Sequence, residues 1–192
     1  MPNIAVASLK HRRLKKGLFI GDAHSSDCVE CINAHCWIIS SDGSYILLQR
    51  RAKTERVFTN MLDISIAGHV DWGEDPKTTI IRETKEEANI NIRKYINNRP
   101  KKIYFSENSM FSGTQFKHNQ QAYIFYAIID HKLITNIQNQ NEEVGGFELY
   151  TIESFIDMVN DKNEELAPHP MEYYKVIIHD ILSIKHTMSI NF

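Results

Sequence analysis

The alternation of apolar and polar positions predicts a sheet built from several short strands. Two β-rich apolar runs, residues 34–40 and 44–50, flank the pair Asp42–Gly43, which favours a two-residue hairpin turn. We therefore expect these two runs to be antiparallel neighbours. The same patterning predicts further strands at residues 62–70, 101–107, 120–129 and 147–152.

Helices are predicted between and after these strands. Asp75 and Pro76 have the residue types preferred at an N-cap and at the first helical position, and this helix should run to about Ala88. A short helix is expected at residues 152–160, and an amphipathic C-terminal helix at 170–188. The mixture indicates the α/β class, with helices able to cover both faces of a sheet.

Length and composition are those of a single globular domain spanning residues 1–192, in which residues 1–30 form an N-terminal arm and a first strand. Hydrophobic residues make up 42% and charged residues 24% of the chain. The formal net charge of −2 gives no general attraction for nucleic acid or an anionic membrane. One basic run, residues 9–17, is interpreted either as a solvated arm or as part of an anion site.

Membrane insertion and secretion are not expected. No apolar run approaches the roughly 18 residues that a membrane span needs, and the N-terminus lacks the order of charges typical of a secretory signal. We expect a cytoplasmic protein. Cys28, Cys31 and Cys36 are interpreted as thiols in strands. The alternative is a zinc site that begins with Cys28 and Cys31 and is completed by His24, His35 or Cys36.

Acidic residues crowd the predicted helix after Pro76. Glu83, Glu86 and Glu87 stand three and four residues apart, so their side chains share one helical face. Like charges at this spacing destabilise an isolated helix by roughly 0.2–0.5 kcal/mol per pair. A solvated acidic face is one interpretation. The other is a site for a hard divalent cation, because magnesium prefers oxygen ligands.

The stretch from residue 68 to residue 90 resembles the Nudix box, G-x5-E-x7-R-E-U-x-E-E-x-G-U, in which U is a bulky aliphatic residue. The matching positions are Gly68, Glu74, Arg82, Glu83, Glu86, Glu87 and Ile90. Two positions depart from the pattern. Thr84 replaces an aliphatic residue, and its hydroxyl is expected to bond the carbonyl four residues back. Asn89 replaces the last glycine, where it should adopt a left-handed conformation.

This resemblance implies a Nudix-type α/β/α sandwich around a mixed sheet, and a hydrolase that cleaves a diphosphate linked to another group, often a nucleoside. It further implies a Mg²⁺ or Mn²⁺ cofactor held by Glu83, Glu86 and Glu87, with the Gly68 carbonyl as an additional ligand. Arg82 would orient Glu74 or Glu83 by a charge-assisted hydrogen bond.

The general base stays open at this point. Glu86, Glu87 and a glutamate of the later polar loop, Glu142 or Glu143, are the candidates, and the loop pair is equally interpretable as solubilising charge.

Substrate contacts are predicted outside the carboxylate cluster. Arg50, Arg51 and Lys53 follow a strand and either bind phosphate or are simple strand-end charges, and Arg51 is the residue we select. Trp72 lies inside the box loop, where it would stack on a base or pack the loop. The expected partner is a small diphosphate, without nucleic acid or membrane, and the protein is a monomer or a homodimer.

An isomerase and a non-catalytic binding module are the two alternatives to a hydrolase. The flanks of the box resemble those of type I isopentenyl-diphosphate isomerase, but Ala67 stands where that enzyme has its cysteine, and Cys31 where it has a metal-binding histidine. The second alternative is a Nudix module that binds nucleotides without cleaving them. Its usual mark is the loss of metal glutamates, and here all of them are kept.

Overall fold

The computed structural model describes residues 3–8, 14–18, 29–55, 57–97, 99–111, 114–138 and 142–190. The strands are β1 (Ile4–Ser8), β2 (Leu14–Leu18), β3 (Val29–Ser40), β4 (Tyr45–Arg51), β5 (Leu62–Asp63), β6 (Ile66–His69), β7 (Lys101–Phe111), β8 (Thr114–Ile129) and β9 (Val144–Thr151). The α-helices are α2 (Pro76–Ala88), α3 (His131–Ile134), α4 (Ile152–Asn160) and α5 (Met171–Ile190), and a 3-10 turn, η1, covers Ile92–Lys94.

Strand β3 organises the sheet, and every one of its residues is buried. It pairs in parallel with β8 along residues 30–40, and it pairs antiparallel with β1, β4 and β6. Strand β8 continues into an antiparallel hairpin with β7, while β4 carries β9 and β5. The sheet is therefore mixed, as the resemblance to the Nudix box implies.

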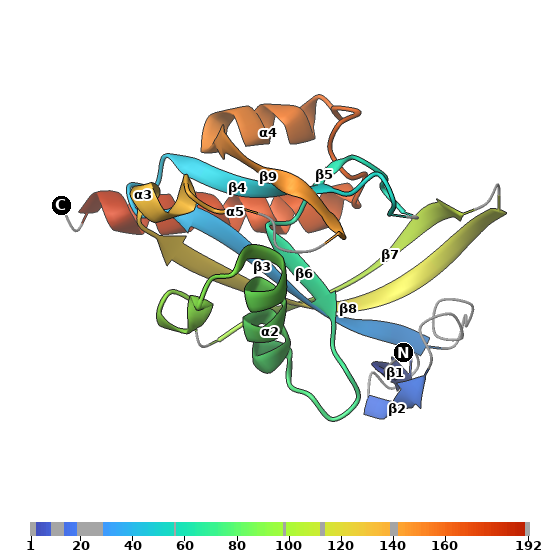
Figure 1. Cartoon of the computed structure of the whole chain (residues 1–192). Coiled ribbons are helices and arrows are strands. Elements are labelled where there is room, and N and C mark those ends of the chain that lie inside the picture. Colours follow the sequence, from blue (N-terminus) through green and yellow to red (C-terminus); the bar gives the residue numbers. More distant parts are fainter. Residues whose placement is uncertain are drawn as a thin grey trace.

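Helices cover both faces of this sheet (Figure 1). On one face α2 packs through Ile80 and Ala88 against apolar residues of β3 and β8. On the other face α4 and α5 pack around the fully buried Trp37 through Phe155 and Tyr173. Alternation along β3 supplies both cores, because successive side chains point to opposite faces. The predicted α/β/α sandwich is confirmed.

Most predicted elements are present, with different lengths. The run 34–40 belongs to a strand that begins at Val29, and its pairing with β4 is limited to Ile38↔Leu47 and Ile39↔Ile46. The C-terminal helix runs from Met171 to Ile190. The interval 152–160 forms α4 as predicted.

The single strand predicted over residues 62–70 is wrong, because the chain forms β5 and β6 with a break between them. The buried Ser65 hydroxyl donates to the Leu47 carbonyl at 2.5 Å and accepts from the Ile38 amide at 2.9 Å. A side chain thus replaces ladder bonds where β3 and β4 diverge. Apolar alternation alone does not reveal such a substitution.

The N-terminal region contains more structure than an arm and one strand. Strands β1 and β2 form a hairpin whose first strand joins β3. Cys31 and Cys36 are buried free thiols on opposite faces of β3, and burial raises the pKa of Cys31 to about 12. They cannot share one zinc ion. Cys28, His24 and most of the basic run lie outside the described residues. No helix within the described ranges is long and apolar enough to cross a bilayer.

Candidate active site

The acidic helix α2 begins and ends through local contacts. The Asp75 side chain accepts hydrogen bonds from the amides of Lys77 and Thr78, and Pro76 occupies the first helical position. At the other end, Asn89 adopts φ 54° and ψ 30°, and its amide donates to the Thr84 carbonyl. The left-handed Asn89 predicted from the sequence is confirmed.

Thr84 also behaves as predicted. It is fully buried, and its hydroxyl donates to the Ile80 carbonyl at 2.6 Å. The hydroxyl therefore has a partner inside the apolar layer, which makes the departure from an aliphatic residue structurally acceptable.

Gly68 lies on β6 opposite Ala34 of β3, directly beneath the helix. A Cβ atom at this position would lie 2.2 Å from Oε1 of Glu83 and 2.5 Å from its carboxyl carbon. A side chain at residue 68 would displace the Glu83 carboxylate, which packs directly against the glycine backbone. The first residue of the box thus positions a carboxylate by leaving space for it.

Arg82 is the main cation among these carboxylates. Its guanidinium contacts Glu83 at 2.9 Å, and Glu74 and Glu86 at 3.2 Å, with Asp71 at 3.7 Å. Burial pushes the pKa of Glu74 up, but the Arg82 and Thr79 hydrogen bonds hold it below its ordinary value. One guanidinium therefore forms ion pairs with four carboxylates.

Two glutamates of the cluster carry charge that is poorly compensated. Burial, opposed by Arg82 and assisted by Glu86, raises the pKa of Glu83 to about 7. Burial and the neighbouring Glu83 raise the pKa of Glu87 well above its ordinary value. Buried carboxylates that repel each other are stabilised by an added cation. Carboxylate oxygens are the type of donor that Mg²⁺ and Mn²⁺ prefer.

Glu86 differs from these two, since its side chain is 53% exposed and directed to Arg82. Within the described residues, no three His, Cys, Asp or Glu side chains converge well enough to hold a metal ion. The three predicted ligands therefore share one helical face but have different partners. Arg82 contacts Glu83 and Glu86, whereas Glu87 accepts a hydrogen bond from a residue of β4.

Residues from distant segments reach the same cluster. Glu143 precedes β9, its carbonyl accepts from the Ala52 amide at 3.0 Å, and its charge raises the pKa values of Glu83 and Glu87. The charge of Arg51 acts on Glu87 in the opposite direction. The fold therefore places both predicted residues, Glu143 and Arg51, close enough to α2 for their charges to act on Glu87.

The side chain of Arg51 has protein partners. It contacts Glu55 at 2.6 Å, the Val57 carbonyl at 2.9 Å and Asp63 at 3.8 Å. Trp72 is 49% exposed and lies beside the N-terminal hairpin: a Cβ atom added at Gly17 would lie 2.8 Å from Cβ of Trp72. The structure therefore places Arg51 near the carboxylates and Trp72 at the β1–β2 side of the loop.

A buried ionic cluster that the sequence analysis missed occupies the opposite face of the sheet. His169, just before α5, contacts Asp63 at 2.8 Å and Glu107 at 2.9 Å. Burial lowers the pKa of His169, but the two carboxylates outweigh this and raise it to about 10. Gln120 donates to Glu107 and accepts from Asn33 at 2.5 Å. Each partner comes from a different segment, so no local motif marks the cluster.

Gln49 was also missed. It is a buried polar residue on β4, and its Nε2 donates to Oε2 of Glu87 at 2.8 Å. A sequence signal did exist, because period-two alternation places Gln49 on the same face as the buried Leu47. A polar side chain at an inward position is a candidate partner for a buried group.

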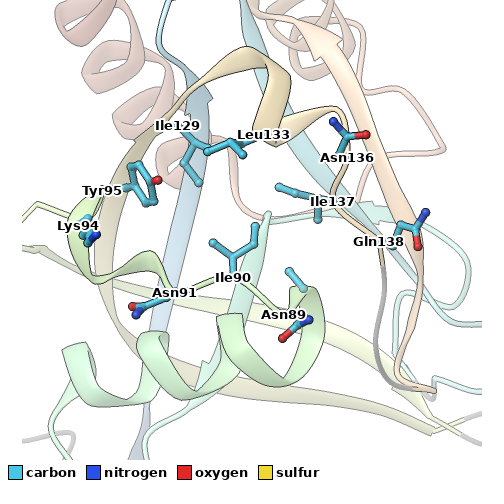
Figure 2. A pocket seen from close by; sticks show the side chains of 11 residues that line it. Asn89, Ile90, Asn91, Lys94, Tyr95, Ile129, Leu133, Asn136, Ile137 and Gln138 are labelled. Atoms are coloured by element: carbon cyan, nitrogen blue, oxygen red, sulfur yellow. The ribbon is translucent and has the colours of Figure 1, made fainter.

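A cavity of about 540 Å³ lies beyond the C-terminal end of α2 and away from the glutamates. Figure 2 shows its wall of Ile90, Tyr95, Ile129, Leu133 and Ile137, with several carboxamides around it. It contains none of the predicted site residues.

Residues 30–171 match the family model described as the NUDIX domain. This chain belongs to the NUDIX domain family. The match includes the complete box and the strands on both sides of it, so the resemblance noted in the sequence extends over most of the chain.

The individual proteins that resemble this Nudix domain match it over shorter segments than the family model does. It is 34% identical over 61 residues to an uncharacterized Nudix hydrolase of Clostridium acetobutylicum, covering 31% of this chain and 29% of that protein. It is 29% identical over 70 residues to an isopentenyl-diphosphate Δ-isomerase of Citrobacter koseri, covering 36% and 38%. The matches span about a third of the length of these curated relatives.

Among solved structures, DR0079 from Deinococcus radiodurans superposes with a TM-score of 0.63 at 15% identity, covering 90% of this chain and 97% of that one. At this identity the similarity establishes the fold alone.

Proposed function

We propose that this Nudix domain is a divalent-metal-dependent hydrolase that cleaves the diphosphate bond of a nucleoside diphosphate linked to another group. The observation that carries the proposal is the pair Glu83, which is half-buried, and Glu87, which is buried: the positive charge around them does not offset their desolvation, and both pKa values are raised. They stand in a box that keeps all of its glutamates, on the helix where the family resemblance locates the metal ligands.

The residues that would hold Mg²⁺ or Mn²⁺ are Glu83, Glu86 and Glu87, with the Gly68 carbonyl. The chemistry that such a cation supplies is polarisation of a phosphoryl oxygen and orientation of a water molecule. Arg82 fixes Glu83 through the contact at 2.9 Å and limits its repulsion from the other carboxylates.

Proton removal from the attacking water requires a carboxylate near the metal ligands. Glu143 is supported for this role because it comes from a separate loop and acts electrostatically on both Glu83 and Glu87. Glu86 and Glu87 are the other candidates. Arg51 would hold a substrate phosphate only after exchanging its contact with Glu55, since that carboxylate binds the guanidinium at 2.6 Å.

Isomerase activity receives less support. Ala67 lies on β6 opposite His35, and its methyl group cannot transfer a proton. Cys31 is buried on β3, where burial keeps its thiol protonated. The two positions that differ from the isomerase pattern therefore offer no equivalent chemistry.

The test is incubation of the purified protein with nucleoside triphosphates, nucleoside diphosphate derivatives and isopentenyl diphosphate, with and without Mg²⁺ or Mn²⁺. The proposal predicts metal-dependent release of phosphate, pyrophosphate or a nucleoside monophosphate, absent in the Glu87→Gln variant. Conversion of isopentenyl diphosphate to its allylic isomer would instead establish the isomerase. Binding of a nucleotide without turnover under all conditions would indicate a non-catalytic module.

A further inference from the structure

Gln49 occupies a fixed position inside the sheet. Its strand β4 is paired on both sides, and Gln49 stands opposite Asp63 of β5 and Phe147 of β9. The residue is only 5% exposed. Because two neighbouring strands hold its backbone, the direction of its side chain is determined by the sheet.

This side chain makes one contact with the acidic helix. Its Nε2 donates to Oε2 of Glu87 at 2.8 Å, and both residues are buried. The bond joins β4 to the last turn of α2, across 38 residues of sequence. A carboxamide donates a hydrogen bond without adding positive charge, so it orients Glu87 and leaves the carboxylate charge available to a cation.

The other helix glutamates are oriented by a different group. Among the ion pairs of the described residues, those of Arg82 lead to Asp71, Glu74, Glu83 and Glu86. Glu87 is directed toward the sheet, where Gln49 lies. Two orienting groups, one on the helix and one on the sheet, thus act on different carboxylates of the same site.

We infer that Gln49 is a positioning residue that fixes Glu87 as a metal ligand, an assignment that rests on the proposed function. With Oε2 bound by the Gln49 amide, Oε1 is the oxygen that Glu87 presents to a cation. The donated hydrogen bond and a bound cation would both stabilise the ionised form of Glu87, which makes this carboxylate a weak acceptor of a proton from water. The general base is then sought in Glu143 or Glu86.

The first test compares Mn²⁺ binding by the wild type, Gln49→Met and Leu47→Met, using the electron paramagnetic resonance signal of free Mn²⁺ without substrate. Methionine matches glutamine in length but has no N–H donor. Leu47 is buried two residues earlier on the same face, so Leu47→Met controls for repacking. Loss of a partner behind a metal ligand typically weakens binding about 10- to 100-fold. We expect this for Gln49→Met and less than about a threefold change for Leu47→Met.

A double-mutant cycle separates positioning from general damage. In a Glu87→Gln background, Gln49→Met should change the Mn²⁺ dissociation constant less than about twofold, because the positioned carboxylate is already gone. Equal effects of Gln49→Met in both backgrounds would overturn the inference. So would an unchanged affinity in the single variant. If the wild type itself binds no Mn²⁺, the proposed function fails and the inference fails with it.

A measurement on the unmodified protein covers the case in which Gln49→Met does not fold. The side-chain amide resonances of Gln49, assigned through its own backbone, should shift on addition of Mg²⁺ along with the Glu87 amide. Gln121 is also buried and its amide donates to Tyr123, which makes it the reference resonance. Binding of Mg²⁺ that moves Glu87 and leaves Gln49 unmoved would overturn the inference.

Discussion

The domain buries carboxylates in two places, and the two clusters differ in the source of the compensating charge. On one face of the sheet, Asp63 and Glu107 enclose the imidazole of His169, and all three side chains are at most 8% exposed. On the other face, Glu83 and Glu87 belong to α2, where Arg82 is shared among several carboxylates. The first cluster contains one cation for two carboxylates, whereas in the second a single guanidinium is shared among four.

The pKa shifts express this difference directly. Burial raises the pKa of Asp63, yet the charge and hydrogen bond of His169 hold it below its ordinary value. The pKa of Glu83 rises to about 7, and that of Glu87 rises as well. A buried acid whose charge is balanced inside the protein stabilises the fold, whereas one whose charge is only partly balanced is a candidate ligand-binding group.

The largest expected effect is a loss of stability on disrupting the cluster of His169, Asp63 and Glu107. His169→Gln removes the positive charge and leaves Asp63 facing Glu107 across a neutral amide. Breaking one partner of a buried ion pair costs about 3–5 kcal/mol, which urea unfolding at pH 7 would measure. A loss below about 1 kcal/mol would show that the cluster is not charged as described.

Removal of a carboxylate from the other cluster should damage activity instead. Glu87→Gln is expected to lower metal-dependent turnover by at least about 100-fold, the upper range for loss of an outer-sphere partner, while the protein stays folded. Glu164→Gln, an exposed glutamate outside the site, is the matched control. Equal turnover in both variants would place the metal elsewhere.

Metal binding should stabilise only the protein with an intact acidic cluster. At a Mn²⁺ concentration 100 times the dissociation constant, one site adds about 2.7 kcal/mol to the free energy of unfolding. Denaturant titrations with and without Mn²⁺ would show this gain in the wild type and its loss in Glu87→Gln. The same gain in the variant would contradict the assignment of Glu87 as a ligand.

The pH dependence of stability should report the His169 cluster. The pKa of His169 is raised from 6.5 to about 10, so its contribution is complete below about 6.5 and is lost as the pH rises through about 10. The lowered pKa of Asp63 acts oppositely, and its contribution is lost in acid. Unfolding measured from pH 6 to pH 10 should show a decline in the wild type that His169→Gln lacks.

The smallest effect is expected at the exposed edge of the acidic cluster. The Glu86 side chain is 53% exposed, so water already solvates its charge. In the metal-free protein, Glu86→Gln should change the free energy of unfolding by no more than about 0.5 kcal/mol. A larger loss in urea unfolding would mean that the Arg82 contact is structurally important.

Local features of the helix were predictable because their causes are local. The Asp75 cap, the Pro76 start and the left-handed Asn89 each depend on contacts within a few residues. The spacing of Glu83, Glu86 and Glu87 follows from helical geometry, and the box adds the role of Gly68. For these reasons the sequence alone predicted the helix, its acidic face and the family resemblance.

The tertiary structure alone decided which distant residues complete each cluster. Gln49 meets Glu87 because β4 lies under the end of α2, and His169 meets Glu107 because the β7–β8 hairpin passes the start of α5. Pairing between segments far apart in the sequence depends on the whole sheet, including the parallel contact of β3 with β8. Sequence determined where charges stand along the chain, and folding determined which of them are neutralised.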